Sequence, residues 1–145
     1  MSPVIVGIDG SSHSQRALEW AVREAAIRKL PLTVITVYRT VVSYWGTIML
    51  PQDPALAGKA REDAIEATEK ALALVGEARP ESVTIEVLGG LAAEELVAAS
   101  RDAEMIVLGS RGNGGFARLL LGSVSTAVTH HAHCPVVVIP AENRH

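Results

Sequence analysis

The sequence predicts an α/β fold built on a parallel sheet, because strand-like and helix-like segments alternate along its 145 residues. Short β-branched runs are separated by stretches whose apolar residues have helical spacing. Apolar residues make up 48% of the chain and charged residues 20%, which is typical of a folded protein with one core. Five strands alternating with four helices indicate a doubly wound sheet with helices on both faces, and right-handed crossovers favour the order 3-2-1-4-5. We expect a single domain over residues 1–145.

Each expected element has its own residue pattern. The strands are predicted at Val4–Ile8, Leu32–Tyr38, 82–88, 105–108 and 135–139. The helices are predicted from a cap at Ser11 or Ser12 to about Leu30, over 59–78 and 91–101, and from the end of a glycine-rich loop to His133. Apolar residues alternate with Thr84 and Glu86 in the third strand, which is typical of a sheet edge. Residues 40–58 fit neither period, so we expect a long loop there.

Charge and composition exclude several functional classes. The net charge is −3 and aromatic residues make up only 3% of the chain, so we expect no nucleic acid partner. Cys134 is the single cysteine, which excludes an intrachain disulfide and fits a reducing compartment. The apolar run over residues 3–8 is too short for a signal peptide or a membrane span. We therefore expect a cytoplasmic protein without a membrane partner.

The glycine-rich segment after the fourth predicted strand is the most informative motif in the chain. Residues 109–112 read Gly-Ser-Arg-Gly, and Gly122 and Ser123 follow after a nine-residue spacer, directly before a predicted helix. Glycine lets backbone N–H groups turn toward an anion, and a helix N-terminus adds unpaired N–H donors and the positive end of the helix dipole. The hydroxyls of Ser123 and Ser125 add donors. In the predicted strand order this segment meets Asp9 at the switch point, where α/β sheets bind ligands. The sequence therefore predicts a nucleotide site.

Two widespread phosphate motifs do not fit this loop. The P-loop needs a lysine directly after a glycine, and no lysine stands beside a glycine of this loop. The dinucleotide fingerprint is matched only weakly by residues 112–117, and the acidic residue that it needs about 20 positions further on is missing. The spacing Gly-x2-Gly-x9-Gly-Ser instead resembles the ATP-binding signature of the universal stress protein family.

The resemblance extends over the whole chain, through residues 6–11, 93–97, 106–112, 122–125 and 134–138. One departure is Ala92, where relatives often carry proline before the third helix, a difference that concerns a helix start and not the site. The resemblance implies an adenine nucleotide alpha-hydrolase-like fold, ATP as the ligand, and a role in the stress response. It also implies a homodimer paired through the fifth strand, and an uncovered apolar edge strand itself favours such pairing. The interface residues would be Val136, Val137, Val138 and Ile139.

The family pattern assigns roles to individual positions. Gly109, Gly112, Gly122 and Ser123 match the phosphate loop, the backbone of Val37 matches the contact to the adenine edge, and Asp9 matches an aspartate on the adenosine part. Asp9 can also cap the first helix. Among the cations of the loop, Arg118 is favoured over Arg111 as the phosphate contact because it lies inside the spacer, although a solvated surface position stays open for it. The full predicted nucleotide site is Gly7, Asp9, Val37, Gly109, Arg111, Gly112, Gly114, Gly115, Arg118, Gly122, Ser123, Val124 and Ser125.

The expected function is binding with little chemistry. Phosphoryl transfer needs a base, charge stabilisers and a metal clamp, and the loop contains no carboxylate. Ser123 supplies at most one ligand to Mg²⁺, and the segment with His130, His131, His133 and Cys134 lacks a second ligand group, so we expect no metal site and no catalytic residue. We therefore predict an ATP-binding regulator with at most slow hydrolysis and an unidentified protein partner. The alternatives are an enzyme of the nucleotide alpha-hydrolase type that activates a substrate with ATP, and an interaction module without a ligand.

Overall fold

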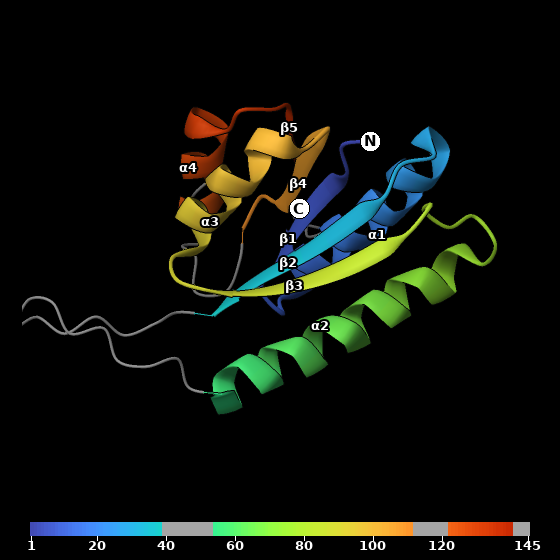
Figure 1. Cartoon of the computed structure of the whole chain (residues 1–145), viewed down its shortest axis with the longest axis horizontal. Coiled ribbons are helices and arrows are strands. Elements are labelled where there is room, and N and C mark those ends of the chain that lie inside the picture. The colour runs from blue at the N-terminus through green and yellow to red at the C-terminus, as the bar shows by residue number, and fades with distance from the viewer. Residues whose placement is uncertain (39–53, 112–121, 141–145) are drawn as a thin grey trace, which may run out of the picture.

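The computed structural model describes residues 1–38, 54–111 and 122–140. Helices and strands alternate as predicted (Figure 1). In chain order they are β1 (Val4–Ile8), α1 (Ser12–Arg28), β2 (Leu32–Tyr38), α2 (Pro54–Val75), β3 (Val83–Gly89), α3 (Ala92–Ala99), a short 3-10 helix η1 (Ser100–Asp102), β4 (Met105–Gly109), α4 (Ser123–His131) and β5 (Val136–Ile139).

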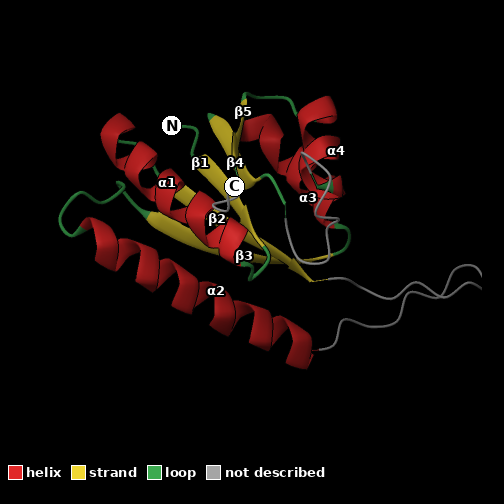
Figure 2. Ribbon diagram, turned by 180° about the vertical axis from the view of Figure 1, so that it is seen from behind, coloured by secondary structure: helices red, strands yellow, loops and turns green. Residues whose placement is uncertain are grey.

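The five strands form one parallel sheet in the order β3-β2-β1-β4-β5, which confirms the predicted topology. Helices α1 and α2 cover one face of the sheet, and α3 and α4 cover the other (Figures 1 and 2). The carboxyl ends of β1 and β4 are neighbours at the switch point, where the direction of winding reverses. None of the helices in the described ranges combines the length and apolar character that crossing a membrane requires.

Alternating residues of each strand pack into two separate hydrophobic clusters, one on each face of the sheet. Val4 and Val6 pack with α1 and α2 in one cluster, whereas Ile5 packs with Leu96 of α3 and Val128 of α4 in the other. This period-two division is the geometry of a strand that is covered on both faces. It explains why β1 is apolar throughout and buried at every position.

The largest boundary error concerns α2, which begins at Pro54 and not at residue 59. The predicted loop over 40–58 is therefore too long. Proline is well suited to the first turn of a helix because that turn does not use its missing N–H group. The helix ends at Val75, before the predicted residue 78, because Gly76 adopts a positive φ of 61°, the usual left-handed helix stop.

The other helices also end earlier than predicted. Helix α1 stops at Arg28, and Lys29 closes it in the left-handed conformation with a φ of 59°. Helix α3 stops at Ala99 and passes into η1, and α4 stops at His131. Periodicity marks where apolar residues face the core but not where the backbone leaves the helix, so such errors are expected.

Candidate functional site

A cavity of about 170 Å³ opens at the carboxyl ends of β1 and β4, where the topology predicts a ligand. Its described lining includes nine of the predicted site residues, namely Gly7, Asp9, Val37, Gly109, Arg111, Gly122, Ser123, Val124 and Ser125. The other four, Gly112, Gly114, Gly115 and Arg118, lie outside the described residues. Segments that are about 100 residues apart in sequence therefore line one cavity, as predicted.

One side of the cavity is apolar. Ile35 and Val37 of β2, Leu96 of α3 and Leu108 of β4 line it. A Cβ atom on Gly7 would lie 3.0 Å from Leu108 Cδ2 and 3.1 Å from Leu96 Cδ1, so glycine lets these leucines pack against β1. This wall suits a flat, weakly polar group such as a heterocyclic base.

Sequence reasoning missed part of the lining. The residues absent from the predicted site are Ile8, Ser14, Ile35, Ala92, Leu96 and Leu108. The period of two in β2 was an available signal for Ile35, because it must share a face with Val37. The contributions of α3 depend on helix packing, for which the sequence has no comparable signal.

A hydrogen-bonded turn joins β1 to α1 beside the cavity. Asp9 Oδ1 accepts bonds from the backbone N of Ser11 at 2.9 Å and from its Oγ at 2.6 Å. Ser11 is the N-cap of α1, and its Oγ accepts from the N of Ser14 at 3.2 Å. The Oγ of Ser14 in turn accepts from the N of Asp9 and donates to the carbonyl of Ser11. Asp9 therefore holds the N-cap residue Ser11 in place, and Asp9 itself also borders the cavity.

The N-terminus of α4 borders the opposite side of the cavity. Its N-cap is Gly122, which provides no side chain to the backbone N–H groups of the first turn. Ser123 and Val124 line the cavity directly after this cap. An uncapped helix start with a positive dipole end is a site for an anion.

The base of the glycine-rich loop is closed by hydrogen bonds. The N of Gly122 donates to the carbonyl of Ser110. The Oγ of Ser125 is 3.1 Å from both the Ser110 and the Gly122 carbonyl oxygens, and Ser125 is only 3% exposed. Because a hydroxyl has one proton, Ser125 uses it to hold the loop ends together. Of the two serines predicted to donate to a ligand, Ser123 is therefore the better candidate, because it is exposed at the cavity rim.

Arg111 is the one cation among the described lining residues. Its Nε is buried and has no hydrogen-bond partner in the described part of the chain. A buried N–H group without an acceptor costs about 1–3 kcal/mol, and more in a charged side chain. An anionic ligand in the cavity would supply the missing acceptor.

Gly109 is required by packing as well as by the phosphate motif. A Cβ atom at this position would lie 3.0 Å from the carbonyl oxygen of His13 and 3.1 Å from its carbonyl carbon. The end of β4 therefore passes against the backbone of the first turn of α1. The absence of a side chain at Gly109 lets these two borders of the cavity approach each other.

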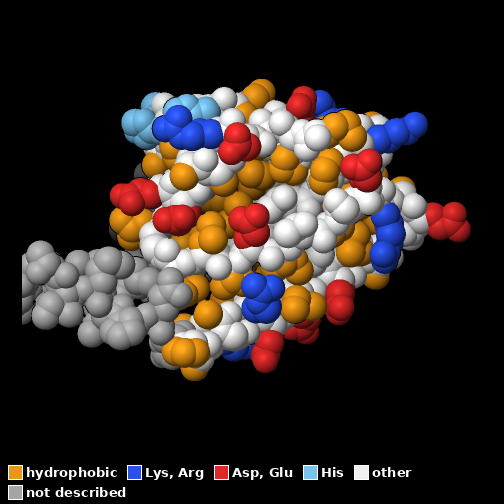
Figure 3. Space-filling view, viewed as in Figure 1, with side chains coloured by type: hydrophobic (Ala, Val, Ile, Leu, Met, Phe, Trp, Pro, Cys, Tyr) orange, Lys and Arg blue, Asp and Glu red, His pale blue; other side chains and the backbone are white. Residues whose placement is uncertain are grey.

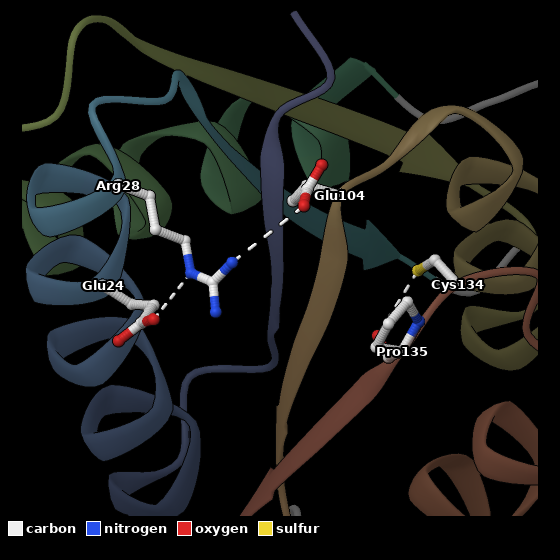
Figure 4. A network of polar contacts seen from close by, with 5 residues as sticks. All are labelled: Glu24, Arg28, Glu104, Cys134 and Pro135. Atoms are coloured by element: carbon white, nitrogen blue, oxygen red, sulfur yellow. Dashed lines mark hydrogen bonds and ion pairs between the residues drawn. The ribbon is translucent and has the colours of Figure 1, made fainter.

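The histidine-rich segment lies away from this cavity. His130 and His131 end α4, and histidine side chains gather at one corner of the surface (Figure 3). Cys134 lies at the amino ends of the strands, where its Sγ is 3.4 Å from the Pro135 carbonyl (Figure 4). Burial, with a smaller effect of Glu104, raises the pKa of the Cys134 thiol, which keeps it protonated at neutral pH. In the described ranges no three His, Cys, Asp or Glu side chains gather as metal ligands.

The parallel sheet of this order and the helix N-terminus over a switch-point cavity define a doubly wound α/β protein with the adenine nucleotide alpha-hydrolase-like fold. The model of the universal stress protein family matches residues 1–140, and the chain belongs to this family.

Two curated relatives are universal stress proteins of Mycobacterium tuberculosis and Mycolicibacterium smegmatis, each 38% identical over 97% of this chain. The matches cover 48% and 49% of those proteins, so the chain spans about half the length of these relatives.

Solved structures show the same fold. The universal stress protein UspA from Lactobacillus plantarum has a TM-score of 0.76 at 23% identity, with 95% of this chain and 97% of that chain covered. A universal stress protein in complex with cAMP has a TM-score of 0.71 at 26% identity, with 96% of both chains covered.

Proposed function

We propose that this protein is a nucleotide-dependent stress-response regulator, a single domain that binds ATP in the cavity between β1 and β4. The buried Nε of Arg111 carries this proposal, because it needs an acceptor and stands beside the uncapped start of α4. A related universal stress protein, 26% identical, was solved in complex with cAMP, which supports an adenine nucleotide as the ligand class.

The cavity suits the two ends of ATP differently. The apolar wall with Ile35 and Val37 accepts the base, and the neighbouring Asp9 accepts hydrogen bonds from ribose hydroxyls or the adenine amine. A carboxylate repels phosphate, so the phosphates belong on the other side, with Arg111 and the first turn of α4. Mg²⁺ would neutralise phosphate charge when bound, and the Ser123 hydroxyl, on the proposed phosphate side of the described lining, could be one of its ligands.

The same residues favour binding over catalysis. Asp9 and Arg111 are the ionisable residues in the described lining of the cavity. Asp9 already accepts two hydrogen bonds from Ser11, and its side chain belongs to the sugar side. A general base next to the terminal phosphate is therefore not supplied by these residues, and we expect slow ATP turnover at most.

We further propose a homodimer through β5. This strand lies at an edge of the sheet and pairs with β4 on its inner side. Its four residues are apolar and half-buried. A second copy, antiparallel about a two-fold axis, would cover this edge and close the assembly after two chains.

Calorimetric titration with ATP, adenosine and NAD tests the nucleotide proposal. We expect ATP to bind with a Kd below about 1 mM. Arg111→Gln should weaken ATP binding about tenfold and leave adenosine unaffected, because a charge-assisted hydrogen bond to phosphate is lost. Arg101→Gln is the matched control, since Arg101 is exposed on η1.

Two results would reject the assignment. One is the absence of ATP binding at millimolar concentration, and the other is equal ATP affinity in both arginine variants. Mass analysis of any ligand that stays bound through gentle purification gives an independent check on the nucleotide.

A further inference from the structure

The strand β3 forms the edge of the sheet opposite β5 (Figure 1). Among the described strands it pairs with β2 alone, one residue to one over its whole length and without a β-bulge. It has seven residues and β5 has four, so β3 is the longer of the two edge strands. The proposed dimer pairs through β5, and the β3 edge therefore stays free in a monomer and in that dimer alike.

The hydrogen bonds of the ladder decide which backbone groups of β3 are available. The N of Leu32 donates to the carbonyl of Ser82, at the residue before β3 begins. Backbone groups of a parallel strand alternate between its two sides, so the even-numbered residues of β3 bond to β2. The N–H and C=O groups that point away from the sheet belong to Val83, Ile85 and Val87.

The side chains of β3 differ between its two faces. Val83 and Ile85 pack partly against the core cluster that contains α2 residues, whereas Thr84 and Glu86 are exposed on the opposite face. An added strand would continue both faces, because its side chains also alternate. Apolar side chains of that strand would lie next to Val83 and Ile85, and the side chains between them would lie next to Glu86.

Glu86 is the only charged residue within β3, and it disfavours pairing of the strand with a second copy of itself. Antiparallel pairing about a two-fold axis with full overlap of Val83–Gly89 is centred on residue 86. The two Glu86 side chains would then stand directly opposite each other, and like charges in that position are destabilising. The other common protections of an edge, namely proline, lysine, a bulge or a very short strand, are absent from β3. The edge is therefore guarded against its own copy but open to a strand with positive charge.

The segment that leads into β3 adds to the negative charge. Residues 76–89 contain the carboxylates of Glu77, Glu81 and Glu86 and the guanidinium of Arg79, which gives a net charge of −2. All four side chains belong to exposed residues. Charge complementarity therefore favours a basic partner strand and disfavours an acidic one.

We propose that β3 is a docking site for an extended protein segment in which basic and apolar residues alternate. The segment adds to the sheet as a sixth strand and pairs with the outward backbone groups of Val83, Ile85 and Val87. Its apolar side chains extend the layer beside α2, and its basic side chains lie next to Glu86. The proposal stands apart from ATP binding, because no residue of β3 belongs to the described lining of the nucleotide cavity.

Amide NMR titrations with two heptapeptides test this site. In one peptide lysine and valine alternate, and in the other glutamate and valine alternate. Each reads the same in both directions, so it can pair parallel or antiparallel. We expect the lysine peptide to shift the amides of Val83, Ile85 and Val87 with a Kd of about 1 mM or tighter. The glutamate peptide should bind at least about tenfold more weakly, because its charges face Glu86.

Hydrogen exchange gives a second readout of the same edge. In the free protein the outward amides of Val83, Ile85 and Val87 should exchange faster than those of Thr84 and Glu86, which are bonded to β2. The lysine peptide should slow the exchange of the outward amides and leave the inward ones nearly unchanged.

Matched variants locate the binding. Glu86→Lys should reverse the preference, so that the glutamate peptide binds more tightly, whereas Asp102→Lys makes the same change of charge in the exposed η1 and should not. Val87→Pro should weaken the binding of the lysine peptide, because proline removes an outward N–H but no bond to β2. Val87→Thr keeps this N–H and should bind the peptide as the wild type does.

The proposal is overturned if the lysine peptide shifts no amide of β3, or if the two peptides bind equally well. Shifts confined to β5 would also overturn it, because they would place the added strand at the other edge. If Val87→Pro does not fold, the charge reversal at the exposed Glu86 still decides between these outcomes.

Discussion

At the residue scale, Gly109 lines the proposed site and is also needed for packing. Its missing side chain lets β4 approach the carbonyl of His13, which a Cβ atom would reach at 3.0 Å. We expect Gly109→Ala to lower the free energy of unfolding by about 1–3 kcal/mol, the range for overpacking, in addition to weakening ATP binding. Urea denaturation measures the first effect, and calorimetry measures the second.

Gly58→Ala is the matched control for this substitution. Gly58 lies inside α2, and a Cβ atom there meets nothing within 4 Å. The variant should be more stable than the wild type by about 0.4–1 kcal/mol, because alanine restricts the unfolded chain. If Gly109→Ala unfolds at the wild-type urea midpoint, the close approach to His13 does not constrain this position.

Asp9 should distinguish the sugar side of the nucleotide site from the phosphate side. We expect Asp9→Ala to weaken adenosine as well as ATP, because the proposed contact of its carboxylate is with the ribose or the base. The variant also loses two hydrogen bonds to Ser11, so binding must be measured well below its unfolding temperature. Asp102→Ala, in the exposed η1, is the control. Unchanged adenosine affinity in Asp9→Ala would contradict the role.

At the level of elements, the buried face of α2 contains a threonine hydroxyl that lowers the stability of the fold. Thr68 is only 3% exposed, and its Oγ1 has no partner in the described part of the chain. Thr68→Val keeps the shape and removes the desolvated hydroxyl, so we expect a gain in unfolding free energy of about 1 kcal/mol. Thermal and urea denaturation measure this gain.

Thr129→Val makes the same change in α4 where the hydroxyl has acceptors. The Oγ1 of Thr129 donates to the carbonyls of Ser125 and Thr126, so its removal should not stabilise the protein. An equal gain in both variants would indicate a general effect of valine in these helices and not the unpaired hydroxyl of Thr68.

At the level of the whole molecule, the edge strand β5 decides the predicted assembly. Val137 and Ile139 pack on one core and Val136 on the other, whereas Val138 belongs to neither cluster. Val138→Lys therefore places a charge at the predicted interface with the least loss of core packing, and we expect it to shift a dimer to monomer. Light scattering at micromolar concentration measures the mass.

Thr84→Lys provides the control at the opposite edge of the sheet, where Thr84 of β3 is exposed. This variant should remain dimeric. A monomeric wild type would refute pairing through β5, and loss of the dimer in Thr84→Lys would move the interface to β3.

The sequence by itself determined the class of fold. Strand and helix periods and turn residues are local signals, and the handedness of crossovers leaves few possible strand orders. It also predicted that Asp9 and the segment from Gly109 to Ser123 would meet, since topology brings the ends of β1 and β4 together.

Only the tertiary structure decided which buried polar atoms have hydrogen-bond partners and where the backbone approaches too closely for a side chain. The Ser125 hydroxyl lies within hydrogen-bond distance of the Ser110 and Gly122 carbonyls, and a side chain at Gly109 would meet the backbone carbonyl of His13. These properties depend on distances between segments that are remote in sequence. Residue type and periodicity encode which face is buried, but the packing of α1 and α2 against the sheet sets what each buried atom contacts.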